Sequence, residues 1–126
     1  MKLSGPTEVA PIRSLLLKHP REAWLGQEEV RKQWRALGYP AEPDLDRACD
    51  EYDRFVEILR RSVPDVRFLP ADDATGLDSI YVRDAACVAP RGLVLGRMGK
   101  ALRKGEPRAI RDFCASAGWP VIGEIL

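Results

Sequence analysis

The sequence has 126 residues, the size of one domain, and 45% of them are hydrophobic, which is enough to build a core. Charged residues make up 31% of the chain, and the formal net charge is only +1. This composition excludes a disordered chain, and the balanced charge gives no field that would attract nucleic acid or an anionic membrane. We treat residues 1–126 as a single domain in which residues 1–11, polar and containing two prolines, form a loose leader.

The sequence carries no targeting signal that we recognise. No apolar run is long enough to span a bilayer, and the N-terminus lacks the apolar core of a signal peptide. We therefore expect a cytoplasmic protein that does not bind membranes.

The three cysteines, Cys49, Cys87 and Cys114, are widely spaced and form no C-x-x-C pair. Each lies in an apolar pattern, so we expect buried, reduced thiols without a redox role. A zinc site would also need histidines, and His19 is the only one in the chain. We predict no metal.

The first half of the chain predicts one strand and two helices. Residues 12–18 are a short apolar run that suits a buried strand and stops at a His-Pro pair. Apolar residues then recur at helical spacing in a segment that ends at Gly38, where a helix-terminating glycine is expected. Residues 44–61 form the clearest element, because one face is continuously apolar and the other carries opposite charges four residues apart.

The second half predicts short strands around one helix, which begins at Pro107 and is capped by Gly118. The strands are bounded by turn-forming residues, and the second of them continues into the third past a break at Asp84. The predicted strands are residues 66–69, 79–82, 86–89, 93–97 and 121–125, with a basic loop at residues 99–105. This order predicts an α/β or α+β domain, with helices on one side of a small mixed sheet.

Two aspartates, Asp78 and Asp84, frame the strand predicted at residues 79–82. A carboxylate can accept two hydrogen bonds from the planar fork of a guanidinium, which orients that cation and compensates its charge. A fully extended chain would separate the two acids by roughly 20 Å, so they could share one small group only if the chain bends. The alternative is that both are turn residues, because Asp is common in turns.

Four cations follow in the sequence, at Arg97, Lys100, Arg103 and Lys104. They could clamp an anion such as a carboxylate. The alternative is a solvated basic loop ahead of the last helix. Binding of nucleic acid is the weaker interpretation, since no aromatic residues are interleaved with these cations and the protein is nearly neutral.

The run DSIYVRD, followed by LGRMGK and RKGEP, resembles the N-terminal part of the guanidino-group-modifying enzymes. These enzymes include dimethylarginine dimethylaminohydrolases, arginine deiminases and bacterial amidinotransferase-like proteins. LLLKHPREAW and PDLDRACDEYDRFVEILRR resemble the opening segment and first long helix of that family, so the resemblance covers residues 15–126. It implies a pentein-type α/β propeller of five ββαβ modules around a central site, with residues 78–125 as one module.

The resemblance also implies roles for the polar residues. Asp84 matches the aspartate that binds the substrate guanidinium, and Asp78 matches a second acid near the substrate. Arg103 or Lys104 matches the arginine that contacts the substrate carboxylate. At Arg83 the sequence departs from the dimethylarginine hydrolases, which usually have an acid there, and agrees with the deiminases and amidinotransferase-like proteins.

In that family a cysteine nucleophile and a general acid/base histidine lie further along the chain than this sequence reaches, and His19 does not match that histidine. The resemblance therefore implies the substrate-orienting N-terminal portion of an enzyme that acts on arginine-like guanidino compounds, without a metal or organic cofactor. The alternative is a non-catalytic partial homologue that binds a partner. Because residues 119–126 are mostly apolar, we expect either self-association or pairing with the rest of the propeller.

Overall fold

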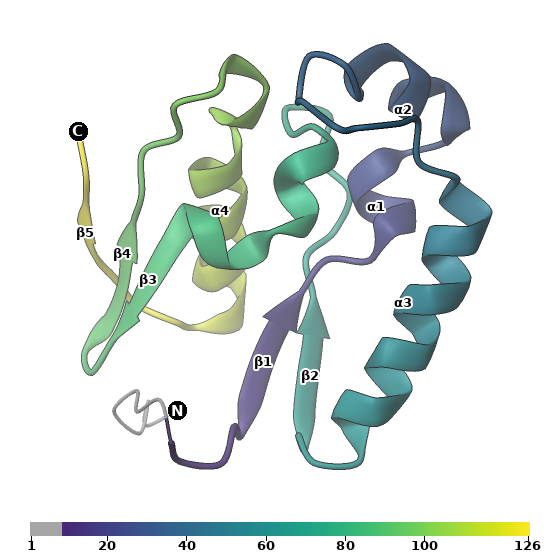
Figure 1. Cartoon of the computed structure of the whole chain (residues 1–126). Helices are drawn as coiled ribbons and strands as arrows, with labels where there is room; N and C mark the ends of the chain where they lie inside the picture. The colour runs from purple at the N-terminus through teal and green to yellow at the C-terminus, as the bar shows by residue number, and fades with distance from the viewer. Residues whose placement is uncertain (1–8) are drawn as a thin grey trace.

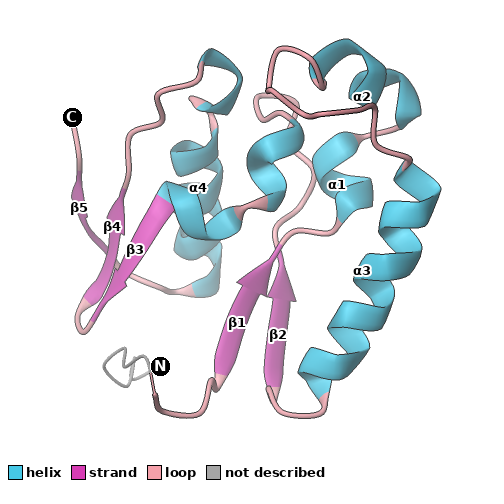
Figure 2. Ribbon diagram, in the orientation of Figure 1, coloured by secondary structure: helices cyan, strands magenta, loops and turns pink. Residues whose placement is uncertain are grey.

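The computed structural model describes residues 9–126, so the leader predicted at residues 1–11 lies mostly outside the described residues. The strands fall into two separate small sheets, each accompanied by helices (Figures 1 and 2). The elements are β1 (Ser14–Leu17), α1 (Pro20–Trp24), α2 (Gln27–Gln33), α3 (Leu45–Arg60), β2 (Asp65–Phe68), the 3₁₀ turns η1 (Leu77–Ile80) and η2 (Val82–Ala85), β3 (Ala86–Ala89), β4 (Gly92–Leu95), the 3₁₀ turn η3 (Ala101–Arg103), α4 (Glu106–Ala117) and β5 (Val121–Glu124). The predicted mixture of α and β structure is confirmed.

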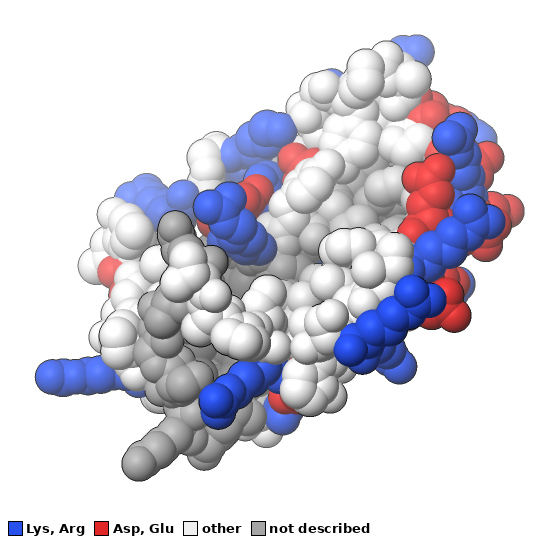
Figure 3. All heavy atoms as spheres, turned by 60° about the horizontal axis from the view of Figure 1, so that its bottom comes forward, with Lys and Arg blue, Asp and Glu red and all other residues white. Residues whose placement is uncertain are grey.

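The first sheet pairs β1 with β2 in parallel, from Ser14 opposite Asp65 to Leu17 opposite Phe68. The connection runs through α3, the helix that the sequence predicted most clearly. Asp44 caps this helix, because its Oδ1 accepts a hydrogen bond of 2.8 Å from the backbone N–H of Arg47. Acidic and basic side chains alternate along its outer face, at the right-hand edge of Figure 3. This face is solvated, as the charge pattern predicted.

The helix predicted to end at Gly38 is instead two short helices, α1 and α2. Leu25 and Gly26 interrupt it, with φ angles of 60° and 135°. Trp24 and Val30 lie on opposite sides of this break and still pack in one core cluster. The helical spacing of apolar residues is therefore kept although the backbone turns. Gly38 has the predicted left-handed conformation, at φ 84°.

The second sheet contains β3, β4 and β5 in that spatial order. The strands β3 and β4 form an antiparallel hairpin, and β5 returns parallel to β4 after α4. This is the ββαβ order that the resemblance implied. Since β1 and β2 do not join it, the single mixed sheet predicted from the sequence is wrong, and only the second sheet is mixed.

The strand predicted at residues 79–82 is also wrong, because residues 77–85 form the 3₁₀ turns η1 and η2. Their apolar residues follow the 3₁₀ period of three. Leu77 and Ile80 pack into the core beside α1 and α2, whereas Val82 and Ala85 pack into the core around β4 and α4. The segment therefore bends as it passes from one core to the other, and we call residues 77–85 the bend segment.

Candidate functional site

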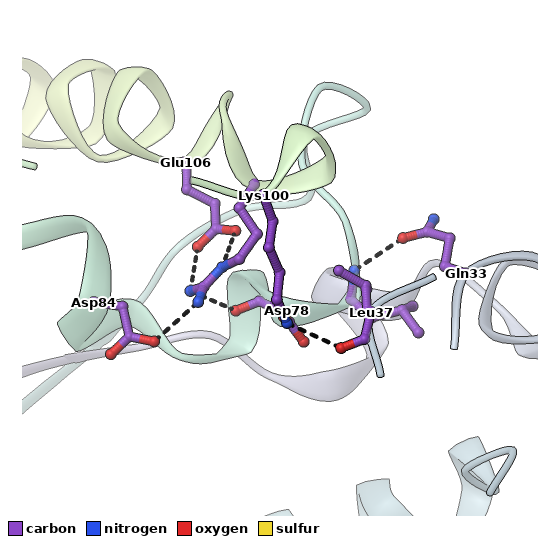
Figure 4. A network of polar contacts seen from close by, with 8 residues as sticks. Gln33, Leu37, Asp78, Asp84, Lys100 and Glu106 are labelled. Atoms are coloured by element: carbon purple, nitrogen blue, oxygen red, sulfur yellow. Dashed lines mark hydrogen bonds and ion pairs between the residues drawn. The ribbon is translucent and has the colours of Figure 1, made fainter. Parts of the chain in front are cut away.

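The guanidinium of Arg103 is the centre of a polar network along the bend segment (Figure 4). Its Nε and Nη2 donate to the two carboxylate oxygens of Glu106, each at 2.8 Å. Nη1 donates to Asp84 Oδ2 at 3.1 Å, and Nη2 also donates to the backbone carbonyl of Asp78 at 3.3 Å. The hydrogen bonds that Arg103 donates to Glu106 raise the pKa of Arg103 above its usual value, although burial opposes this. Because the chain bends, the carboxylate of Asp84 and the backbone carbonyl of Asp78 both reach Arg103, whereas the Asp78 carboxylate bonds to Lys100.

Asp84 is the carboxylate through which this network meets solvent. Its side chain is 45% exposed, against 5% for Asp78 and 4% for Glu106. One carboxylate oxygen is bonded to Arg103, and within residues 9–126 the other has no hydrogen-bond partner. The hydrogen bonds drawn in Figure 4 join these three acids to two cations, Arg103 and Lys100, and the buried Lys18 also interacts with Glu106. The second carboxylate oxygen of Asp84 can accept a further hydrogen bond.

Asp78 is enclosed and has a different role. Its Oδ2 accepts from the Lys100 ammonium at 3.3 Å, and the same ammonium donates to the carbonyl of Leu37 at 2.9 Å. Asp78 Oδ1 and the Tyr39 hydroxyl are buried without a hydrogen bond of good geometry. They lie close enough that the Asp78 carboxylate adds to the effect of burial, which raises the pKa of Tyr39. Asp78 therefore ties the chain after α2 to the bend segment.

Two close approaches fix the start of the bend segment and of α4. The backbone N–H of Leu77 donates to Gln33 Oε1 at 3.1 Å. A Cβ atom on Gly76 would lie 2.7 Å from that oxygen, and one on Gly105 would overlap the backbone carbonyl of Ala74. Position 105 requires glycine, because the atom in the way belongs to the backbone, whereas at position 76 a side chain would displace the end of Gln33 from its bond with Leu77.

The four basic residues do not gather around one point. Lys100 faces Asp78, and Arg103 is held by Glu106 and Asp84. Arg97 and Lys104 line a separate groove of about 550 Å³ along β4, α4 and β5. The structure therefore places the candidate Arg103 at the acids and its neighbour Lys104 elsewhere.

Two buried charged residues escaped the sequence reasoning. Glu106 holds Arg103, and the spacing of three residues between them was a usable signal. Lys18 is 1% exposed at the end of β1 and donates to Thr75 Oγ1 at 3.1 Å. Burial lowers the pKa of Lys18, although Asp72 and Glu106 counteract this. No local pattern marks a lysine that follows an apolar run as buried.

An apolar pocket of about 650 Å³ opens beside Asp84, between β1 and the β3–β4 hairpin. Its lining is mostly aliphatic, with Trp119 as the aromatic member and Arg83 as a neighbour of Asp84. A pocket of this size, with few polar groups, is typical of sites that bind small molecules.

The other side chains that could take part in chemistry are the three cysteines and His19, and none of them belongs to the network around Arg103. Cys49 and Cys114 are buried as predicted, and burial raises the pKa of both thiols, whereas Cys87 is exposed, so that prediction is wrong. His19 caps α1, since its Nδ1 accepts from the backbone N–H of Arg21, and its Nε2 lies 2.8 Å from Asp53 Oδ1.

Residues 9–126 contain neither a candidate metal site nor a candidate membrane-spanning helix. In residues 9–126 no group of three or more His, Cys, Asp or Glu side chains is placed to hold a metal ion. Over the same residues, no helix has both the length and the apolar character needed to cross a membrane.

Comparison with solved structures places this arrangement in a known fold. A dimethylarginine dimethylaminohydrolase in an adduct with 4-chloro-2-hydroxymethylpyridine superposes with a TM-score of 0.66 over 91% of this chain, at 22% identity. A dimethylarginine dimethylaminohydrolase (DDAH) from Pseudomonas aeruginosa, a cysteine-to-serine variant in complex with citrulline, gives 0.70 over 93% of this chain, at 20% identity. The chain has part of the DDAH fold. The matched regions are 41% and 43% of those chains, so this chain spans about two fifths of their length.

The DDAH fold agrees with the partial pentein-type architecture that the motifs implied. No family model matches the sequence, and no curated protein matches it. The low identity limits the likeness to the fold itself. A function can therefore be inferred only from the residues of the bend segment and their contacts.

Proposed function

We propose that this chain is the substrate-orienting part of an enzyme that modifies guanidino groups, and that Asp84 binds the substrate guanidinium. The observation that carries the proposal is the state of Asp84, which is fixed on one side by Arg103 and open on the other. A planar cation with paired N–H donors fits such a carboxylate. The likeness to DDAH structures, one of them in complex with citrulline, supports this choice of ligand.

Arg103 already shows that these acids suit a guanidinium, because Glu106 holds it through two parallel hydrogen bonds. Its charge is compensated by Glu106 and Asp84, so in this proposal Arg103 acts mainly by holding Asp84. Asp78 keeps the bend segment closed against the chain after α2. A substrate carboxylate, if present, would have to reach Lys104 or another cation.

The test is a titration of methylguanidinium and L-arginine into the purified chain, followed by NMR. Asp84→Asn keeps the shape of the side chain and removes its charge, and losing one charge-assisted hydrogen bond should weaken binding roughly 10- to 150-fold. The matched control is Asp112→Asn, which changes an exposed acid on α4 that pairs with Arg108. If Asp84→Asn binds both ligands as well as the control does, the proposed role is wrong.

The chemical steps belong to residues that we expect outside this chain. In the complete enzyme a cysteine thiolate would attack the guanidinium carbon, and a histidine would protonate an amine or ammonia, which leaves as its C–N bond breaks and gives a covalent thiouronium adduct. The histidine would then deprotonate water or an acceptor amine, whose attack on the adduct carbon releases the product and the cysteine thiolate. The purified chain should therefore not turn over arginine or methylarginine. Measurable release of an amine or ammonia by the chain alone would show that its nucleophile lies within these residues.

A second candidate is a self-associating or partner-binding module, and the exposure of β5 favours it. This strand pairs only with β4 among the described elements, and Ile122 and Ile125 are 50% and 59% exposed. An apolar edge strand of this kind recruits another strand unless it is protected, and Glu124 is its one acid.

Sedimentation of dilute protein tests this second candidate. Ile122→Lys should shift an associated species to the monomer, because it places a charge on the edge. Val88→Lys changes an equally exposed residue on β3, the opposite edge of the same sheet, and should leave the mass unchanged. A wild-type monomer whose mass ignores both changes would contradict association through β5.

A further inference from the structure

The proposed function does not explain why the pocket beside Asp84 is lined mostly by apolar residues. It measures about 650 Å³, and its wall is formed by β1, the hairpin and α4. The apolar residues of its lining include Leu15, Leu16, Val82, Leu93, Ile110 and Trp119. A volume of this size holds a small molecule and can bury most of its surface.

The polar groups of this lining are few. The Ser14 hydroxyl is already engaged, since it donates to Asp65 Oδ2 at 2.8 Å. The charged members are Asp84, with its one free oxygen, and Arg83, whose side chain is exposed. Lys104 and Arg97 line the other groove, and Arg103 is bound by Glu106. Apart from Asp84, Arg83 and the engaged Ser14, the lining of the pocket is therefore apolar or contributed by Cys87.

We propose that the pocket binds the apolar substituent of a guanidinium compound while Asp84 binds the cationic head. The ligand class is then an alkyl- or aryl-substituted guanidine rather than a free guanidino amino acid, whose ammonium and carboxylate would have few partners in this lining. This inference rests on the proposed role of Asp84 and adds the nature of the substituent. Burial of the substituent supplies the affinity, and the carboxylate supplies the orientation.

The test is a titration of the purified chain with methyl-, propyl- and butylguanidinium, and with butylurea as the neutral analogue. Each methylene that enters an apolar pocket should strengthen binding about fourfold, so butylguanidinium should bind roughly 50-fold more tightly than methylguanidinium. Butylurea should bind more weakly than butylguanidinium, and Asp84→Asn should remove that difference. Ala86→Leu narrows the pocket and should flatten the dependence on chain length.

Cys87 gives a second measurement on the wild-type protein, which remains informative if Ala86→Leu does not fold. This cysteine lines the pocket and is exposed, whereas Cys49 and Cys114 are buried. Butylguanidinium should slow alkylation of Cys87 by iodoacetamide, and methylguanidinium at equal occupancy of Asp84 should slow it less.

The outcomes separate this inference from the proposed function. If all guanidinium compounds bind alike, all depend on Asp84 and none protects Cys87, the inference is wrong and the role of Asp84 stands. If butylguanidinium and butylurea bind alike and Asp84→Asn changes neither, both proposals are wrong. Binding that increases with chain length, depends on Asp84 and protects Cys87 supports both.

Discussion

Helix α3 and the bend segment are encoded in opposite ways. The features that specify α3 are local, since its apolar stripe, its N-cap at Asp44 and its ion pair between Arg47 and Glu51 all lie within residues 44–61. The bend segment depends on distant residues, because Gln33, Lys100 and Arg103 bond to it from other parts of the chain. The position of the Asp84 carboxylate is therefore set by a distant partner, Arg103, rather than by the local sequence.

The largest effect that distinguishes the two regions should come from Glu106→Gln. This change removes a carboxylate that is 4% exposed and leaves the Arg103 guanidinium, 11% exposed, with a single acid. Breaking a buried ion pair from one side costs about 3–5 kcal/mol of unfolding free energy. Urea denaturation followed by circular dichroism measures it.

The control is Glu51→Gln on α3, whose pair with Arg47 is 62% and 80% exposed. A surface pair of this kind contributes no more than about 1 kcal/mol. If the two variants lose the same free energy of unfolding, the network at the bend segment contributes no more to stability than a surface ion pair. The proposed difference between the bend segment and α3 would then be wrong.

This contrast also explains what the sequence could predict. The boundaries of α3 and the ββαβ order were found because periodicity and turn residues act locally. The spacing of Ile80 and Val82, two residues apart, predicts a strand, but the bend segment forms two 3₁₀ turns. Leu77 lies three residues before Ile80, and Ala85 lies three residues after Val82. This spacing of three, which is typical of a 3₁₀ helix, was the missed signal.

At the candidate site, the motif predicts roles for Asp84 and Asp78, and the sequence could not show that Arg103 bonds to the Asp84 carboxylate and to the Asp78 carbonyl. That contact depends on a hydrogen bond across 19 residues. Nor could it show that Lys18 and Glu106 are buried, because burial of a charge is decided by tertiary partners. The separation of Lys104 from Arg103 has the same origin, since Lys104 lines a groove with Arg97 whereas Arg103 is held by Glu106 and Asp84.

The second prediction uses two glycines near the site. A Cβ on Gly105 would overlap the carbonyl of Ala74, whereas a Cβ on Gly99 would meet nothing within 4 Å. Neither glycine has a left-handed φ, so the two differ only in available space. Gly105→Ala should cost about 1–3 kcal/mol through overpacking. Gly99→Ala should stay within about 0.5 kcal/mol. Equal thermal unfolding midpoints would show that the contact at Ala74 is not tight.

The third prediction concerns Lys18 and pH. Burial lowers the pKa of Lys18, so between its folded pKa and about 10.4 the unfolded chain binds more protons than the folded chain. The contribution of Lys18 to stability should therefore become more favourable as the pH rises through that window. One proton limits the slope to about 1.4 kcal/mol per pH unit.

Lys18→Met provides the reference for this slope. The two proteins share every other titratable group, so the difference between them isolates Lys18. Urea denaturation at pH values from 7 to about 10.4 should show the wild type gaining stability relative to Lys18→Met once the pH rises above the folded pKa of Lys18. A difference that stays constant, or that changes in the opposite direction, would contradict a lysine that resists protonation in the fold.

The smallest effect tests the local encoding of α3. Asp44→Ala removes the hydrogen bond of 2.8 Å from the backbone N–H of Arg47 to Asp44 Oδ1 and leaves that donor to water. An N-cap of this kind contributes about 1 kcal/mol. Asp50→Ala removes an exposed acid from the middle of the same helix and should change stability by no more than about 0.5 kcal/mol. Because the cap acts only on α3, methylguanidinium should bind Asp44→Ala and the wild type equally well under conditions where both are folded. A variant that loses stability and ligand binding together would show that α3 and the bend segment are coupled.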